Sequence, residues 1–278
     1  MTDDYSMSSR GRRRAAFAVA ALVTAGLAAV AAAPAVSAHP IGHLSQADAL
    51  WMPNPATVPA LAATAGQPAA ARPAALTSAT YRFSSILDGA PVRWNPCQAI
   101  HWRTNTGRGP AGGLDVLRAA VAHMAALTGT SWVYDGATAS VPSTSYLPTT
   151  PTNVNKPVLL GWTDGTASDL LRGRPAQVLG MTRTVWFGVD DGMGHRAAAT
   201  RGAVVALDRT DHLPLRGTQS WSATALHELG HVMGLDHPGD ARQLMAATLP
   251  NVTDLQTGDK AGLTHLGRAA GCVVIPGA

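Results

Sequence analysis

The stretch that decides the fold is 227-HELGHVMGLDH-237, near the C-terminal end of a chain of 278 residues. His227 and His231 are four residues apart, and side chains at that spacing lie on one face of an α-helix. Imidazoles held in this way can bind one zinc ion, at Zn–N distances of about 2.0–2.1 Å. Gly234 allows a tight turn after the helix, so that the chain can double back and offer His237 as a third ligand. Three protein ligands leave one coordination position open, which is typical of a catalytic zinc.

Glu228 follows the first histidine and is expected to lie beside the metal without binding it. A carboxylate there can take a proton from a zinc-bound water, since the metal lowers the pKa of that water toward about 7, and can pass the proton to a leaving amine. Surface or core histidines beside a solvated glutamate would have no reason to share this spacing. The motif therefore predicts a zinc hydrolase with Glu228 as its general base.

The motif resembles that of the metzincin peptidases, whose signature HExxHxxGxxH is followed by a Met-turn. Leu244-Met245-Ala246 follows His237 after a short interval, which resembles the matrixin branch of that family. The resemblance implies that Met245 forms the hydrophobic floor under the zinc, although an ordinary core methionine is the alternative. It also implies that residues 246–255 form the wall of the specificity pocket. Because no tyrosine follows Met245 closely, no additional tyrosine ligand is expected.

Hydrophobic periodicity predicts an α+β fold around the motif. Strands are expected at 99–104, 131–134, 157–162, 177–187 and 202–207, and helices at 113–129, from Thr218 or Ser220 to Gly234, and at 256–269. This order is compatible with the fold that the resemblance implies, a metzincin-type zincin. Such a domain has a mixed twisted sheet of about five strands, an active-site helix, a Met-turn and a C-terminal helix. Residues 81–278 are accordingly assigned to one catalytic domain.

The N-terminal segment has the features of an export signal. Arg10–Arg14 precede an uncharged apolar stretch at 15–33, and Val36-Ser37-Ala38 offers small residues for cleavage near Ala38. We therefore predict a signal peptide over 1–38 and a secreted protein without a stable membrane anchor after cleavage. A retained anchor is the alternative, because the stretch approaches the roughly 20 apolar residues that span a bilayer. Its high alanine content, however, makes it only weakly hydrophobic.

Residues 39–80 are rich in alanine and proline and lack a hydrophobic period, which indicates a pro-segment or a linker. Vertebrate matrixins are held latent by a pro-segment cysteine on the zinc, yet no cysteine here precedes Cys97. His39, His43 or Asp48 could block the metal instead, although lone polar residues are usually only solvated. Latency through a cysteine is therefore not expected.

Two cysteines, Cys97 and Cys272, are present in the part expected to be exported. An oxidising compartment and an even count favour one disulfide between them, with two free thiols as the alternative.

The formal net charge is +4, and no cluster of lysine and arginine follows residue 14. Nucleic acid is therefore not expected as a partner. The expected partner is a protein or peptide substrate, and the expected state is a monomer.

The resemblance to matrixins also implies a possible second metal site, which would bind a structural calcium or a second zinc. The loop 190-DDGMGHR-196 brings Asp190, Asp191 and His195 together. The loop lacks the alternating oxygen pattern of a calcium loop. The motif at residues 227–237 predicts one catalytic zinc, and the second metal site stays an alternative.

Three functions are compatible with these features. The favoured one is a secreted zinc endopeptidase. The stretch 93-RWNPC-97 resembles the opening of bacterial matrixin-like proteins, and the content of alanine and arginine agrees with a bacterial source. The alternatives are a zinc hydrolase of non-protein substrates and a non-catalytic secreted zinc-binding or adhesion module of the same fold. Glu228 argues against the last, because binding alone requires ligands but no base.

Overall fold

The computed structural model describes residues 42–43, 49–52, 78–150, 154–190 and 196–273. The strands are β1 (Gly42–His43), β2 (Ala49–Met52), β3 (Arg82–Phe83), β4 (Ile86–Leu87), β5 (Ala90–Pro91), β6 (Ile100–Asn105), β7 (Trp132–Ala137), β8 (Val158–Thr163), β9 (Gly180–Asp190), β10 (Arg196–Asp208) and β11 (Leu235–Asp236). The helices are α1 (Gly113–Thr128), α2 (Trp221–Met233) and α3 (Thr257–Thr264), with short 3₁₀ turns η1 (Thr144–Tyr146) and η2 (Arg268–Ala270). The predicted signal peptide lies outside the described residues.

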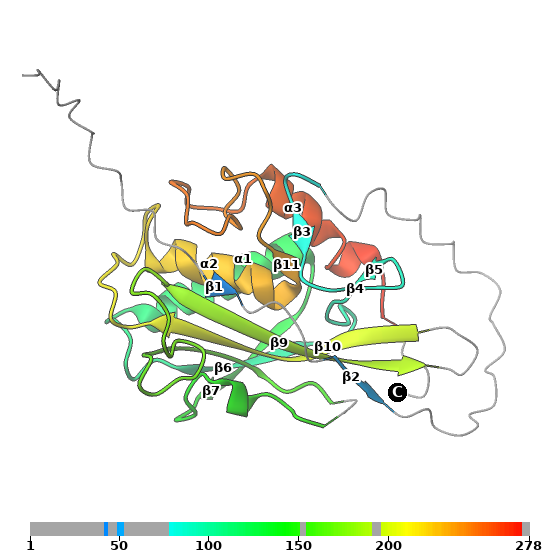
Figure 1. The fold of residues 1–278 in the computed structure, drawn as a ribbon, viewed down its shortest axis with the longest axis horizontal. Helices are drawn as coiled ribbons and strands as arrows, with labels where there is room; N and C mark the ends of the chain where they lie inside the picture. Colours follow the sequence, from blue (N-terminus) through cyan, green and yellow to red (C-terminus); the bar gives the residue numbers. More distant parts are fainter. Residues whose placement is uncertain (1–41, 44–48, 53–77, 151–153, 191–195, 274–278) are drawn as a thin grey trace, which may run out of the picture. The chain divides into compact units, whose positions relative to one another are not determined.

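The main sheet is mixed and runs in the order β1-β9-β10-β8-β6-β7, with β2 also paired to β9 (Figure 1). β9 and β10 are antiparallel, whereas β10, β8, β6 and β7 are mutually parallel neighbours. The five strands predicted from the sequence correspond to β6 to β10, which confirms the predicted α+β fold with a mixed sheet. β9 therefore forms one edge of this five-stranded core, and β1 and β2 pair with that edge.

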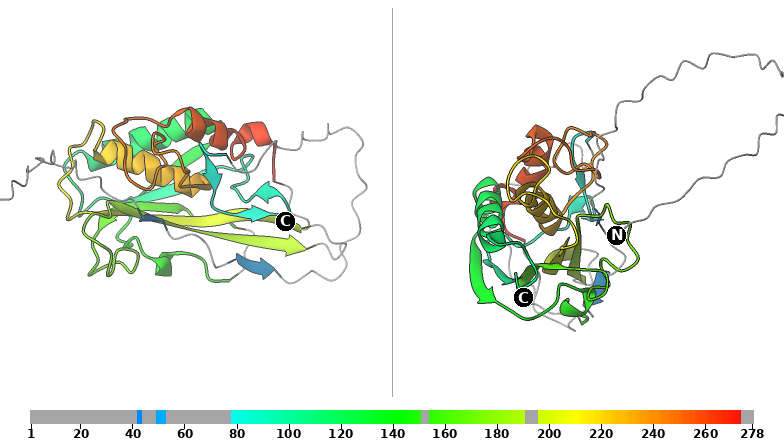
Figure 2. Two further views of the ribbon diagram at one scale, coloured as in Figure 1. Left: turned by 45° about the horizontal axis from the view of Figure 1, so that its top comes forward. Right: turned by 90° about the vertical axis from the view of Figure 1, so that its left-hand side faces the viewer.

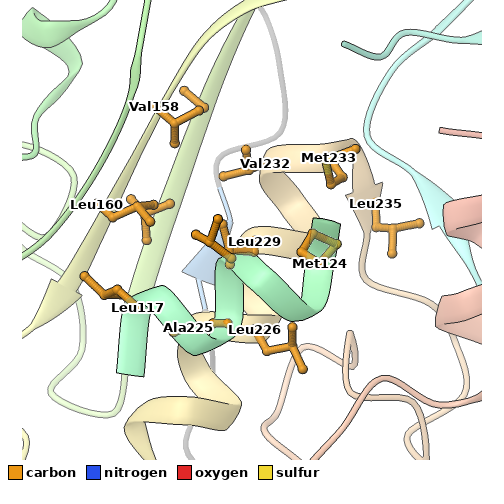
Figure 3. Packing of buried hydrophobic residues seen from close by; sticks show 14 of the residues in the cluster. Leu117, Met124, Val158, Leu160, Ala225, Leu226, Leu229, Val232, Met233 and Leu235 are labelled. Carbon is orange, nitrogen blue, oxygen red and sulfur yellow. The ribbon is translucent and has the colours of Figure 1, made fainter. Parts of the chain in front are cut away.

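Helices α1 and α2 cover one face of the sheet, as two further views show (Figure 2). The apolar core lies between them and the sheet (Figure 3). Its labelled members come from α1, β8, α2 and β11: Leu117, Met124, Val158, Leu160, Ala225, Leu226, Leu229, Val232, Met233 and Leu235. Each fully buried leucine or valine contributes about 1.5–3 kcal/mol to folding, so this layer holds α2 firmly on the sheet. No helix of the described ranges is both long and apolar enough to cross a bilayer.

The ends of α2 follow the predicted signals. Ser220, and not Thr218, caps the N-terminus, because its hydroxyl accepts a hydrogen bond from the N–H of Ala223. Gly234 ends the helix with a left-handed backbone at φ 117°. A Cβ on Gly234 would also lie 3.1 Å from the carbonyl oxygen of Val92, so that both conformation and space favour glycine there.

The C-terminal helix is shorter than predicted. The sequence indicates a helix over 256–269, but α3 ends at Thr264 and the chain continues as a turn and η2. Gly267 has an extended ψ of −164° at this point. A Cβ there would lie 2.3 Å from the carbonyl oxygen of Thr128, so the backbone packs directly against the end of α1. This close approach between segments distant in sequence ends the helical pattern.

Cys97 and Cys272 form the disulfide that the sequence favoured, with a sequence separation of 175 and a Cα–Cα distance of 5.4 Å. The bond joins the segment before β6 to the segment after η2. It closes most of the domain into one covalent loop, which restricts the unfolded chain more than the folded one.

Replacing both cysteines, as Cys97→Ser with Cys272→Ser, is expected to lower the free energy of unfolding by about 2–5 kcal/mol, because the unfolded chain regains its loop entropy. Urea unfolding followed by tryptophan fluorescence measures the change. Wild-type protein reduced with a thiol should unfold at the same urea concentration as the double variant. Equal stability of the oxidised wild type and the variant would contradict this account.

Candidate metal centre

The candidate metal centre begins on α2, which carries His227 and His231 one turn apart. Both side chains are fully buried on the face of the helix that faces the segments after it. The left-handed turn at Gly234 then leads into β11, which pairs with β3 through Leu235 and Asp236. This short pairing directs the chain back so that His237 reaches the two helical histidines, as predicted.

The three Nε2 atoms converge on one point. They lie 3.0 Å apart for His227 and His231, 3.1 Å for His231 and His237, and 3.3 Å for His237 and His227. Ligand nitrogens around a tetrahedral zinc lie about 3.4 Å apart when the Zn–N distance is about 2.0–2.1 Å. Among the described residues, these histidines are the group of three or more His, Cys, Asp or Glu that could hold a metal ion.

The opposite ring nitrogens show which tautomer is present. Nδ1 of His227 lies 2.6 Å from the carbonyl oxygen of Leu244, and Nδ1 of His231 lies 2.8 Å from that of Leu235. A carbonyl oxygen only accepts, so both Nδ1 atoms carry a proton, and the Nε2 atoms of the neutral rings then present lone pairs. Burial lowers the pKa of His237, which favours its neutral form as well. Neutral lone pairs facing one another at this distance fit a cation between them, so that the residues fit zinc.

Glu228 is fully buried next to this group. Burial raises the pKa of its carboxyl group to about 8, against the opposing effect of a hydrogen bond from Thr182. The Thr182 hydroxyl donates to Oε2 at 2.5 Å. Oε1 is buried and makes no hydrogen bond with the part of the chain that the structure describes. A carboxylate oxygen kept open in this way is suited to accept a proton during catalysis.

Met245 packs against the underside of α2. A Cβ at Gly230 would lie 2.3 Å from its sulfur atom, so that glycine at this helical position is what allows the contact. The preceding residue, Leu244, provides the carbonyl oxygen that orients His227. The turn at Met245 therefore supports the metal site through packing and through a hydrogen bond.

Asp259, which the sequence interpretation did not single out, fixes this turn from α3. Its buried carboxylate accepts the N–H of Leu244 at 2.8 Å and the N–H of Met245 at 3.4 Å. Burial raises the pKa of the Asp259 carboxyl group, and the backbone donors oppose that shift. The signal available in the sequence was an acidic residue among the apolar positions of the last helix, which is unfavourable unless the charge is paired or hydrogen-bonded.

The comparison with known families agrees with this geometry. Residues 162–267 match the matrixin family of metallopeptidases. Over this range the chain resembles a matrixin-like metzincin. The matching range begins at the end of β8 and includes β9 to α3, and with them the three histidines, Glu228, Met245 and Asp259. A search of curated proteins found no match to the chain.

The side chains of the predicted second metal site lie outside the described part of the chain. Asp191 and His195 lie outside the described residues, and the side chain of Asp190 is not described either. The calcium or second zinc at the 190–196 loop therefore stays a prediction. His39 and Asp48 also lie outside the described residues, while His43 is described only through its backbone in β1.

His237→Ala is expected to weaken zinc binding by at least about 100-fold, because it removes one of three ligands and leaves two lone pairs on α2. Competition with a chromogenic chelator measures the affinity. His212→Ala is the matched control, since His212 is exposed and belongs to no metal-ligand group of the described chain. Equal losses in both variants, or none in His237→Ala, would contradict the assignment.

Proposed function

We propose that the protein is a secreted zinc-dependent endopeptidase that hydrolyses peptide bonds with Glu228 as general base. The observation that carries the proposal is the convergence of three imidazole nitrogens beside a buried carboxylate whose Oε1 makes no hydrogen bond with the described residues. The matrixin match supports a zinc metallopeptidase at the level of the family. The disulfide between Cys97 and Cys272 supports export, because such bonds persist in oxidising compartments.

His227, His231 and His237 would hold the zinc, which, when bound, polarises the scissile carbonyl and makes a water molecule more acidic. Glu228 then takes a proton from the attacking water at Oε1 and gives it to the leaving nitrogen. Burial gives this carboxylate a raised affinity for the proton, while a nearby cation opposes that effect. The histidines keep their orientation because Leu244 and Leu235 accept their Nδ1 protons.

The edge of β9 supports an extended peptide as the substrate. β9 lies at one edge of the five-stranded core, and its first residues contact Glu228. An extended chain can add to such an edge through backbone hydrogen bonds, which bring its peptide bonds to a fixed register beside the base. A small non-peptide substrate would have no use for this edge, so that the edge favours a peptidase over a hydrolase of other substrates.

We also propose that residues 39–80 are an inhibitory pro-segment and not a passive linker. β1 pairs in parallel with Met181–Thr182, and β2 pairs in parallel with Trp186–Val189. Both strands use the same β9 edge that a substrate would need. The register places His43 opposite Thr182, the residue that contacts the general base. The pro-segment would thus compete with substrate through its backbone, without a cysteine on the zinc.

Glu228→Gln is expected to retain zinc and to lower turnover of casein by about 10²–10⁴-fold, because the amide keeps the volume of the side chain but cannot accept the proton as a base. Zinc content is measured by chelator competition, and turnover by release of labelled peptide. A chelator should abolish wild-type activity and added zinc should restore it. Full activity of Glu228→Gln would contradict the mechanism, and a zinc-loaded wild type without peptidase activity would contradict the proposed function.

Release of the pro-segment is expected to raise activity, because it frees the β9 edge. A specific protease site placed between residues 60 and 70 allows the segment to be cut in the otherwise complete chain. Cutting and dilution should lower the KM for a peptide substrate, while the same protease should leave the unmodified chain unchanged. If KM stays the same after release of the segment, residues 39–80 are only a linker.

A further inference from the structure

Strand β9 contacts the general base through two of its residues, Gly180 and Thr182. Alternate residues of a strand lie on the same face, so both are directed toward α2. Thr182 is fully buried, and its hydroxyl oxygen lies 2.5 Å from Oε2 of Glu228 and 3.3 Å from the carbonyl oxygen of the same residue. A hydroxyl has a single proton, which the shorter contact assigns to the carboxylate.

A buried threonine hydroxyl costs free energy unless it is hydrogen-bonded, and many such groups bond to their own backbone. Here the partner is instead the carboxylate of the proposed base, on another element and 46 residues away in sequence. This hydrogen bond occupies Oε2. It leaves Oε1, the oxygen without a hydrogen bond from the described residues, to accept a proton.

Gly180 restricts the same carboxylate by its lack of a side chain. A Cβ at this position would lie 2.8 Å from Oε1 and 3.1 Å from Cδ of Glu228. The carboxylate therefore occupies the space that any other residue would fill. The carboxylate is the far end of a flexible side chain. A methyl group at position 180 would therefore displace the carboxylate more readily than it would displace strand β9.

We propose that Thr182 and Gly180 are positioning residues for Glu228: Thr182 fixes Oε2 and Gly180 provides the space for Oε1. The inference rests on the proposed function of Glu228 as general base. A free glutamate side chain has three rotatable bonds, and a misplacement of about 1 Å in a catalytic group can cost about 10²-fold in rate. The hydrogen bond and the glycine limit the side chain to one arrangement before substrate binds.

The test compares Thr182→Val, Thr182→Ser and Gly180→Ala in the zinc-loaded full chain after release of the pro-segment. Valine keeps the shape of threonine but removes the donor, whereas serine keeps the donor. We expect Thr182→Val and Gly180→Ala to lower kcat by about 10–100-fold with KM changed less than about twofold. Thr182→Ser should recover most of the kcat. Thr163→Val is the matched control, because Thr163 is also a buried strand threonine, lies on β8, and has a hydroxyl without a hydrogen bond to the described residues.

Two measurements besides activity complete the test. Zinc affinity should be unchanged in all four variants, and crystal structures should show the Glu228 carboxylate displaced in Thr182→Val and Gly180→Ala but not in Thr182→Ser. The proposal is overturned if Thr182→Val keeps the wild-type kcat and carboxylate position, or if Thr182→Ser loses as much activity as Thr182→Val. If wild type shows no peptidase activity, the proposed function fails, and the carboxylate positions alone then decide on the positioning role.

Discussion

The candidate metal centre depends on holding the Nε2 atoms of three histidines within 3.0–3.3 Å of one another. A metal ion can bind there only if all three nitrogens face one point, so the surrounding chain has to fix the orientation of each ring. Packing of α2 on the sheet holds two of the rings, and the left-handed turn at Gly234 with the short β3–β11 pairing holds the third. The carboxylate of Asp259 fixes the Leu244 turn, and the carbonyl oxygen of Leu244 in turn orients His227. Rigidity of these segments is therefore a requirement of the metal chemistry.

Glu228, the proposed general base, is held by a different part of the fold from the candidate metal ligands. The histidines are oriented from the C-terminal side, by the segments around Leu235 and Leu244, whereas Glu228 contacts β9 on the sheet. α2 connects the two sets because it carries both His227 and Glu228. A substrate strand on the β9 edge would be aligned by the same element that holds the base. The same strand would then align the substrate and hold the carboxylate that transfers the proton.

The sequence predicts the parts of this site that depend on spacing within one element. His227, Glu228 and His231 follow from helical periodicity, the turn at Gly234 follows from its position after the last apolar residue, and the five core strands follow from runs of apolar residues. Asp259, Thr182 and Gly180 were missed because their roles arise between elements far apart in the chain. β1 and β2 were missed because they pair through the backbone, which leaves no pattern of side chains to recognise.

The Cys97–Cys272 bond has a consequence for the response of the domain to proteolytic cleavage. It encloses β6 to η2, so that any single cut of the backbone between the two cysteines leaves both pieces covalently joined. The pieces also remain paired through the sheet and the core, since β6, β8 and β10 are neighbours in space. A molecule cut once in this region can therefore keep its metal site assembled. The same cut in a chain without the disulfide would allow the two pieces to separate.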